Sequence, residues 1–330
     1  MNLVGHDEIV DRFRRTLSEG RLASTYLFVG PGGVGKRAFA RRLAECLFCS
    51  ETADAQLEAC GQCESCQLMA AGNHPDYHDL DLPIDENTKK KKRALNIEQF
   101  VGKQEHRNRT GLCHDISLRP YLGSRRVAVI DHADTLTTAT GNVLLKTLEE
   151  PPPHSLLILV GTSEARQLAT IRSRSQIVRF APLESADVAR LLLDNQVVES
   201  AEVANMVAEL ADGSLDQALA MASEDLWQVH TTAVDLLSQP VIDSVRLTQL
   251  VHEYSHGAGK EANLRRDALL AVLGLVSRHY RRHLRADPAS PAAPRIIARI
   301  DRCLDAEYQV DRNVHLQTVI QAWADDLARS

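Results

Sequence analysis

The segment Gly30–Arg37 reads Gly-Pro-Gly-Gly-Val-Gly-Lys-Arg and fits the phosphate-binding pattern G-x-x-x-x-G-K. Glycines let such a loop curl until several backbone N–H groups point at phosphate oxygens, and the following helix N-terminus adds its dipole. The pattern normally ends in a hydroxyl residue that binds Mg²⁺, which Arg37 cannot do. The alternative is a strand-to-helix turn that no longer binds anything. The candidate nucleotide-binding residues of this segment are Gly30, Gly32, Gly33, Gly35, Lys36 and Arg37.

Asp131 directly follows the apolar run Val127–Ile130, a pattern typical of a strand that delivers a carboxylate to a metal ion beside a P-loop. Hydrolysis also needs a group that polarises the attacking water. The next residue, His132, is neutral or cationic near pH 7 and is a poor substitute for a carboxylate. His132 and Arg37 each replace a group that ATP hydrolysis needs, so we expect no significant ATP hydrolysis.

Four cysteines have the spacing of a metal site. Two C-x-x-C steps share a central cysteine, and the fourth cysteine lies upstream, which allows a tetrahedral thiolate site for Zn²⁺. Four soft ligands leave no open position, so the metal would be structural rather than catalytic. The alternative is four unligated thiols in a helical hairpin. The candidate metal ligands are Cys49, Cys60, Cys63 and Cys66, within a module of about residues 47–70.

Two basic segments can be interpreted either as solvent-exposed loops or as functional sites. Arg172 and Arg174 lie between two expected strands, where they would simply be solvated in isolation. Beside a P-loop domain they are candidates for an arginine finger, which stabilises transition-state charge on a neighbour's phosphate. The run Lys89–Arg93 is expected to be a solvated loop, with a phosphate-contacting loop as the alternative.

The elements that must position these residues change character along the chain. The first half alternates helices with short apolar runs, which are typical of parallel strands covered on both faces. A helix is expected from about Lys36 to Leu47, and another over Asn142–Glu150 is stopped by three prolines. We expect an α/β domain over 1–181, a small helical domain over 182–223 and a helical domain over 224–330. The expected strands are 25–29, 126–130, 156–160 and 176–180.

Composition sets outer limits on the function. A chain of 330 residues exceeds one ordinary core and implies about two domains, with room for a small third. With 44% hydrophobic and 25% charged residues it is a folded chain, and its net charge of −6 excludes a generally basic DNA-coating protein. No apolar run approaches the ~20 residues that span a bilayer, and the N-terminus lacks a signal-peptide pattern. We expect a cytoplasmic protein without membrane association.

Taken together, these residues resemble the bacterial clamp-loader branch of the AAA+ family, through the cysteine insert after the P-loop helix and through Leu144–Pro152. The resemblance implies an AAA+ P-loop domain, a helical lid domain and a helical collar domain for oligomerisation. It implies that Arg174 is an arginine finger acting in trans, with its guanidinium exposed in the isolated chain. It also places Thr162 as a nucleotide sensor and Val4 near the adenine.

The clamp-loader family contains a hydrolysing gamma/tau class and a delta-prime class. Arg37, His132 and Asp216 stand where gamma/tau chains carry a hydroxyl, a Glu and an Arg, so the chain resembles the delta-prime class. The resemblance implies a non-hydrolysing subunit of the DNA polymerase III clamp loader, with gamma/tau and delta subunits as partners. The sliding clamp and primer-template DNA would be reached through the complex. Whether ATP or ADP still binds is left open. The alternatives are a hydrolysing gamma/tau-like ATPase and a DNA-binding adaptor.

Overall fold

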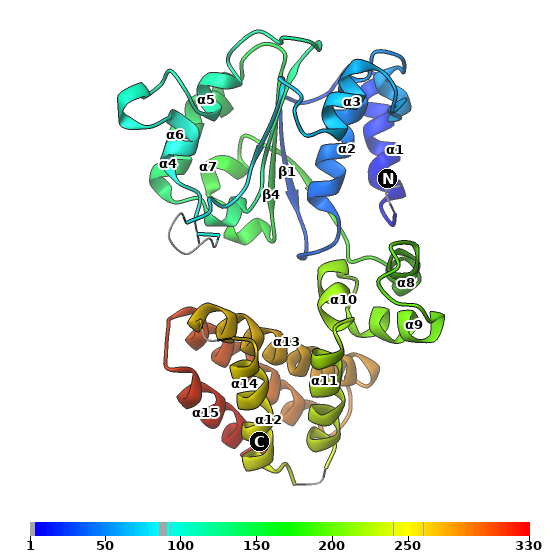
Figure 1. The fold of residues 1–330 in the computed structure, drawn as a ribbon, viewed down its shortest axis with the longest axis vertical. Helices are drawn as coiled ribbons and strands as arrows, with labels where there is room; N and C mark the ends of the chain where they lie inside the picture. Colours follow the sequence, from blue (N-terminus) through cyan, green and yellow to red (C-terminus); the bar gives the residue numbers. More distant parts are fainter. Residues whose placement is uncertain (1–3, 86–90, 93, 240, 260) are drawn as a thin grey trace. The chain divides into compact units, whose positions relative to one another are not determined.

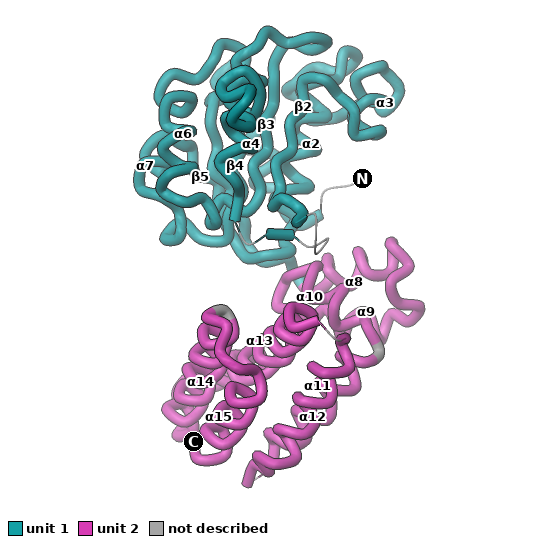
Figure 2. Tube along the Cα trace, turned by 60° about the vertical axis from the view of Figure 1, so that its left-hand side comes forward, with its two compact units in different colours: residues 1–184 teal, residues 185–330 magenta. Residues whose placement is uncertain are grey.

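The computed structural model describes residues 4–85, 91–92, 94–239, 241–259 and 261–330. The chain divides into two compact units, Met1–Glu184 and Ser185–Ser330 (Figure 2). The first unit carries the P-loop, the cysteine module and Arg174. The second contains both of the segments expected as lid and collar domains, and their separation at about residue 223 stays a prediction.

The first unit is built on a five-stranded sheet in the order β2-β3-β4-β1-β5, with every neighbouring pair of strands parallel. The three central strands, β3, β4 and β1, are buried apolar runs, as expected for parallel strands covered on both faces. Strand β5 was also expected from the sequence. The strands are β1 (Thr25–Val29), β2 (Tyr77–Leu80), β3 (Arg126–Ile130), β4 (Ser155–Gly161) and β5 (Gln176–Arg179).

The edge strand β2 was missed by the sequence analysis. Its sequence, Tyr-His-Asp-Leu, contains two polar residues; Asp79 is exposed and the other three residues are partly buried. It pairs with β3 alone, with Tyr77 opposite Val127 and Leu80 opposite Ile130. An edge strand covered on one side needs no continuous apolar run, so the pattern used to find the other strands does not detect it.

Helices cover both faces of the sheet (Figure 1). Alternate residues of β1 point to opposite faces, so Tyr26 and Phe28 pack with Phe39 in one core cluster, whereas Leu27 packs with Leu144 in the other. The helices of this unit are α1 (Asp7–Ser18), α2 (Lys36–Phe48), α3 (Glu64–Ala70), α4 (Ile97–Val101), α5 (Leu112–Asp115), α6 (Thr138–Glu149) and α7 (Ala169–Arg172). Short 3₁₀ turns lie at Asp54–Gln56, Gln104–His106, Ala133–Thr135 and Glu164–Arg166.

The described residues of the second unit form eight helices. The longest, α13, packs against α14, and α14 begins at Ala293 with Pro294 in its first turn, where a missing N–H costs nothing. No helix among the described residues is long and apolar enough to cross a lipid bilayer. The helices are α8 (Ser185–Asp194), α9 (Ala201–Leu210), α10 (Leu215–Met221), α11 (Glu224–Leu237), α12 (Ser244–Gly257), α13 (Ala262–Ala286), α14 (Ala293–Asp311) and α15 (Leu316–Arg329).

A fully buried carboxylate, that of Asp76, joins β2 to the loop before β3. Its two oxygens accept hydrogen bonds from the backbone N–H groups of Tyr121, Leu122 and Gly123 at 2.7–3.0 Å. Arg126 lies 3.6 Å away. Burial by itself would raise the pKa of Asp76, but these donors and the charge of Arg126 outweigh it and lower the pKa. The ionised carboxylate therefore stabilises this edge of the sheet.

We expect Asp76→Asn to lower the free energy of unfolding by about 2–4 kcal/mol, because the amide NH₂ would face backbone N–H donors. Urea denaturation measures this loss. Asp54→Asn is the matched control, since its partly exposed ion pair with Arg125 should contribute less than about 1 kcal/mol. Equal effects of the two substitutions would contradict the assignment.

The same carboxylate makes stability depend on pH. Because the folded-state pKa of Asp76 lies below its unfolded value, its stabilisation is complete above the unfolded pKa of about 3.9 and is lost as pH falls through the folded pKa. The stability difference between the wild type and Asp76→Asn should therefore shrink on acidification below about pH 4.

Candidate functional site

The P-loop lies where the sequence predicts it, between β1 and α2. Gly30 has a φ of +153°, and a Cβ there would lie 2.3 Å from the carbonyl oxygen of Phe180. Gly35 caps α2 in the left-handed conformation. The backbone thus requires glycine at both positions whether or not a ligand binds. Gly32 differs, because a Cβ there would meet nothing within 4 Å.

The P-loop lysine folds back onto its own loop. The Nζ atom of Lys36 donates a 2.7 Å hydrogen bond to the carbonyl oxygen of Gly30 and another to that of Pro31. Lys36 is buried. A phosphate chain would have to compete with these carbonyl oxygens for the ammonium group.

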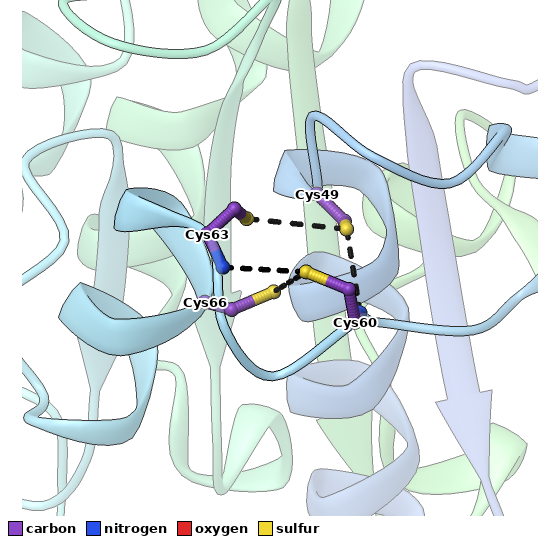
Figure 3. A group of neighbouring side chains, drawn as sticks. All are labelled: Cys49, Cys60, Cys63 and Cys66. Atoms are coloured by element: carbon purple, nitrogen blue, oxygen red, sulfur yellow. Dashed lines mark hydrogen bonds between the residues drawn. The ribbon is translucent and has the colours of Figure 1, made fainter.

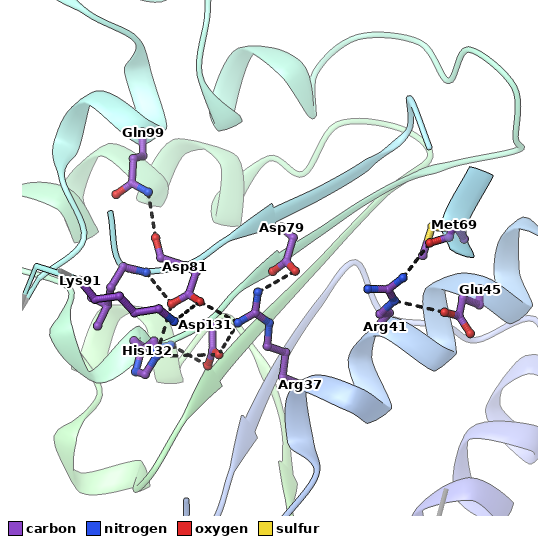
Figure 4. A network of polar contacts seen from close by, with 11 residues as sticks. Arg37, Arg41, Glu45, Met69, Asp79, Asp81, Lys91, Gln99, Asp131 and His132 are labelled. Carbon is purple, nitrogen blue, oxygen red and sulfur yellow. Dashed lines mark hydrogen bonds and ion pairs between the residues drawn. The ribbon is translucent and has the colours of Figure 1, made fainter. Parts of the chain in front are cut away.

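Arg37 lies at the centre of an acidic cluster (Figure 4). Its guanidinium is 2.8 Å from a carboxylate oxygen of Asp79, 2.8 Å from one of Asp81 and 3.4 Å from one of Asp131. Asp79 lies in β2, Asp81 follows β2, and Asp131 follows β3. The carboxyl ends of neighbouring parallel strands meet at one edge of a sheet, which brings the three side chains together.

The acidic cluster changes the pKa values of its members. Burial alone would lower the pKa of Arg37, but hydrogen bonds to Asp79 and Asp81 outweigh it, so the pKa is raised. Burial would raise the pKa of Asp81, whereas hydrogen bonds from Lys91 and Arg37 bring it down to about 2. Asp79 and Asp81 carry no sequence signal as site residues, because the strand that positions them has no apolar pattern.

His132 joins the rim of the acidic cluster instead of supplying a carboxylate. It has a φ of +54°, and its Nε2 lies 3.4 Å from Asp81 Oδ1 and 3.9 Å from Asp131 Oδ2. The basic run Lys89–Arg93 falls partly outside the described residues. Of its members, Lys91 lies 2.5 Å from the carboxylate of Asp81.

Two further predicted nucleotide residues lie near the carboxyl edge of the sheet. Thr162 follows β4, and its backbone N–H donates a 2.6 Å hydrogen bond to Asp134, which comes shortly after β3. Val4 belongs to the N-terminal segment, in which the ring of His6 is hydrogen-bonded to the carbonyl oxygen of Val34 in the P-loop at 2.7 Å. This bond ties the segment that carries Val4 to the P-loop.

Asp216 lies in the second unit, exposed in the first turn of α10. A carboxylate at a helix N-terminus interacts favourably with the helix dipole, which is sufficient reason for an acidic residue there.

Arg174 lies in the loop between α7 and β5, and its guanidinium is paired. One of its nitrogen atoms is 2.6 Å from Glu149 Oε1 at the end of α6, and another donates to the carbonyl oxygen of Thr170 at 3.1 Å. The side chain of Arg174 is 34% exposed and that of Glu149 is 50% exposed. Arg174 is exposed, as expected, and it also forms an ion pair with a carboxylate of the same domain.

The four predicted cysteines come together between α2 and α3 (Figure 3). Their Sγ atoms all lie within 4.8 Å of one another. The Cys49–Cys63 and Cys60–Cys66 sulfur pairs are 4.0 and 3.9 Å apart. Four thiolates around a tetrahedral Zn²⁺ at ~2.3 Å would be separated by about 3.8 Å. The cluster therefore has the size of a four-thiolate metal site.

Local N–H groups support anionic sulfur in this cluster. The backbone N–H of Cys60 donates to Cys49 Sγ at 3.4 Å, and that of Cys63 donates to Cys60 Sγ at 3.3 Å. Burial would raise the pKa of Cys49, but the Thr52 hydroxyl and the Cys60 N–H outweigh it and lower the pKa to about 6. These residues could hold one metal ion without rearrangement of the backbone.

With this geometry described, comparison with known proteins identifies the family. A sequence profile described as "DNA polymerase III, delta subunit" matches residues 5–184. The chain belongs to this family. The match covers the whole sheet, the P-loop, the cysteine module and Arg174.

Among curated proteins, DNA polymerase III subunit delta' of Pseudomonas aeruginosa is 36% identical over 197 residues, which are 58% of this chain and 53% of that protein. The chain thus spans about half the length of this relative. Further subunit delta' sequences match at 28–32% identity, which confirms the resemblance to the delta-prime class. DNA polymerase III subunit gamma/tau of Mycobacterium bovis is 32% identical over 252 residues, 71% of this chain and 39% of that protein.

Among solved structures, a DNA polymerase III gamma subunit-related protein from Thermotoga maritima covers 98% of this chain and is itself covered to 98%. Its sequence is 15% identical and its TM-score is 0.48, so we draw no functional conclusion from it.

We expect about one metal ion per chain in protein prepared without chelator, as measured by elemental analysis. Cys63→Ser should remove it and lower the melting temperature, because the metal links α2 to α3. Cys113→Ser is the matched control, since Cys113 lies outside the cluster, and it should retain the metal. A metal-free preparation that melts at the same temperature before and after metal addition would contradict the prediction.

Proposed function

We propose that this chain is a non-hydrolysing subunit of the replicative sliding-clamp loader and supplies Arg174 in trans to the ATP site of a neighbouring subunit. Membership of the DNA polymerase III delta subunit family supports the assignment to the clamp loader. The observation that carries the arginine-finger role is the position of Arg174 relative to the P-loop of its own chain.

Arg174 and the P-loop lie at opposite edges of one sheet. The P-loop follows β1, at the carboxyl edge, whereas Arg174 comes just before β5, at the amino edge. Because β1 and β5 are parallel, the length of a strand separates them. Five residues at about 3.3 Å each correspond to about 16 Å, well beyond hydrogen-bonding distance. Arg174 is therefore too far from the P-loop of its own chain to act on a phosphate there, which supports a role on another subunit.

The ion pair with Glu149 does not prevent this role. Both side chains are substantially exposed, and ion pairs of this kind contribute about 0–1 kcal/mol. A guanidinium has five N–H donors in a planar fork, so it can turn toward the equatorial oxygens of a transferring phosphoryl group. In this proposal Glu149 is a positioning residue that holds Arg174 at the amino edge until a phosphate replaces it.

The chain's own P-loop is unsuited to hydrolysis. Arg37 occupies the position of the metal-binding hydroxyl and lies among the carboxylates, His132 replaces a general base, and Lys36 contacts loop carbonyl oxygens. Phosphoryl transfer depends mainly on positioned charge, so these changes should reinforce one another.

The remaining features serve assembly in this proposal. The cysteine cluster would hold a structural Zn²⁺, whose four thiolate ligands leave no position for a substrate. Helices of the second unit would form the collar that holds the subunit among gamma/tau and delta subunits. The sliding clamp and primer-template DNA would be reached through that complex, in the cytoplasm.

The isolated, metal-loaded chain should show no ATPase activity above background in a Mg²⁺-dependent phosphate-release assay. The physical reason is the missing metal-binding hydroxyl and the missing base described above. A gamma/tau subunit in the same assay is the positive control. If turnover matches that control and is abolished by Lys36→Ala, the chain is a working ATPase and the proposal is wrong.

In a reconstituted loader, Arg174→Ala should slow ATP hydrolysis at the adjoining site, where arginine fingers are worth about 10³–10⁵ in rate. Arg174→Lys should recover little of the lost hydrolysis rate, because an ammonium group retains the charge but lacks the planar, forked N–H donors of a guanidinium. Arg172→Ala is the matched control: this exposed arginine, at the end of α7, contacts only a carbonyl oxygen of Glu164 among its described partners. If the loader with Arg174→Ala hydrolyses ATP and loads clamps at wild-type rates, and the variant loses only a little stability, Arg174 is not an arginine finger.

A further inference from the structure

The guanidinium of Arg37 lies where a P-loop protein would place a divalent cation. In such proteins the residue after the P-loop lysine and the carboxylate after the neighbouring strand both bind Mg²⁺. Here those two positions are Arg37 and Asp131, and they contact each other directly at 3.4 Å. The residue that should bind the metal has therefore become the cation that the carboxylate binds.

Acidic side chains surround the guanidinium of Arg37 and provide carboxylate oxygens of the kind that bind a cation. Asp79 and Asp81 bring two further carboxylates to Arg37, and one ligand atom from each of Asp81, Asp131 and His132 lies within 4.8 Å of the others. Carboxylates gathered around one point repel one another, and a nearby positive charge offsets this repulsion. Arg37 supplies one such charge and Lys91 supplies a second.

We propose that Arg37 is an intramolecular substitute for the divalent cation, so that the carboxyl edge of the sheet is held together without metal. The planar guanidinium reaches Asp79 with one nitrogen atom and Asp81 and Asp131 with another, thereby linking β2 and β3 to the start of α2. Removal of Arg37 should expose a latent Mg²⁺ site made of carboxylate oxygens, the ligands that Mg²⁺ prefers. This inference goes beyond the proposed function and does not depend on Arg174.

The test compares melting temperatures of the full chain, with its cysteine cluster loaded with metal, in the presence and absence of millimolar Mg²⁺. Wild-type protein should melt at the same temperature in both conditions. Arg37→Thr, which restores a hydroxyl, should melt about 3–6 °C lower without Mg²⁺ and recover at least half of that loss when Mg²⁺ is added. Arg37→Thr combined with Asp131→Asn should stay low in both conditions, because the latent site has lost a ligand.

Arg41→Thr is the matched control, because Arg41 lies one turn further along α2 and contacts Glu45 and the carbonyl oxygen of Met69 instead of the acidic cluster (Figure 4). Its melting temperature should not respond to Mg²⁺. A second measurement, loss of the free Mn²⁺ signal in electron paramagnetic resonance, should show about one additional ion bound by Arg37→Thr relative to wild type.

Two results would overturn the proposal. One is an Arg37→Thr variant that, in the absence of Mg²⁺, melts at the same temperature as the wild type. The other is a wild-type chain that binds Mn²⁺ as tightly as Arg37→Thr does, which would mean that the guanidinium does not occupy the cation position. If Arg37→Thr does not fold in the absence of divalent ions, folding on addition of Mg²⁺ supports the proposal and failure to fold with Mg²⁺ rejects it.

Discussion

Parallel pairing of β1 with β4 and β5 is the constraint on which the chemistry of the first unit depends. It buries continuous apolar runs on both faces, and it sends every connecting loop to one of two edges. The P-loop, Asp131 and Thr162 lie at the carboxyl edge, and Arg174 lies at the amino edge. A single sheet thereby keeps the P-loop apart from the arginine that is proposed to act on another subunit.

The two edges differ in how their charges are balanced. At the carboxyl edge the guanidinium of Arg37 contacts three carboxylates, those of Asp79, Asp81 and Asp131. At the amino edge Arg174 contacts the single carboxylate of Glu149. The two arginine side chains are exposed to a similar extent, so the difference lies in the number of carboxylates that each one pairs with.

The cysteine module is organised more locally than the sheet. Cys49 directly follows α2 and Cys66 lies in α3, and the other two cysteines lie in the connection between these helices, after its 3₁₀ turn. Hydrogen bonds to sulfur come from the backbone of the same loop. A site of this kind requires only two neighbouring helices and one connection, which explains why its spacing is visible in the sequence.

Short-range patterns were sufficient for the features that lie within a few residues of one another. The P-loop, the four cysteines and the apolar runs of β1, β3 and β4 are all readable from the sequence, because glycine placement, ligand spacing and continuous burial leave local signatures. Arg37 and His132 each stand next to such a local motif, so the loss of the usual hydroxyl and carboxylate at these positions is also readable from the sequence.

The tertiary structure alone decided which distant side chains meet. Strand β2 leaves no apolar signature, so neither its existence nor the contact between Arg37 and Asp79 could be inferred. The pairing of Arg174 with Glu149 joins residues from separate elements that come together only because α6 ends and β5 begins at the same edge of the sheet. Parallel order and register determine such contacts, and both arise from pairing between segments far apart in the chain, which no local pattern encodes.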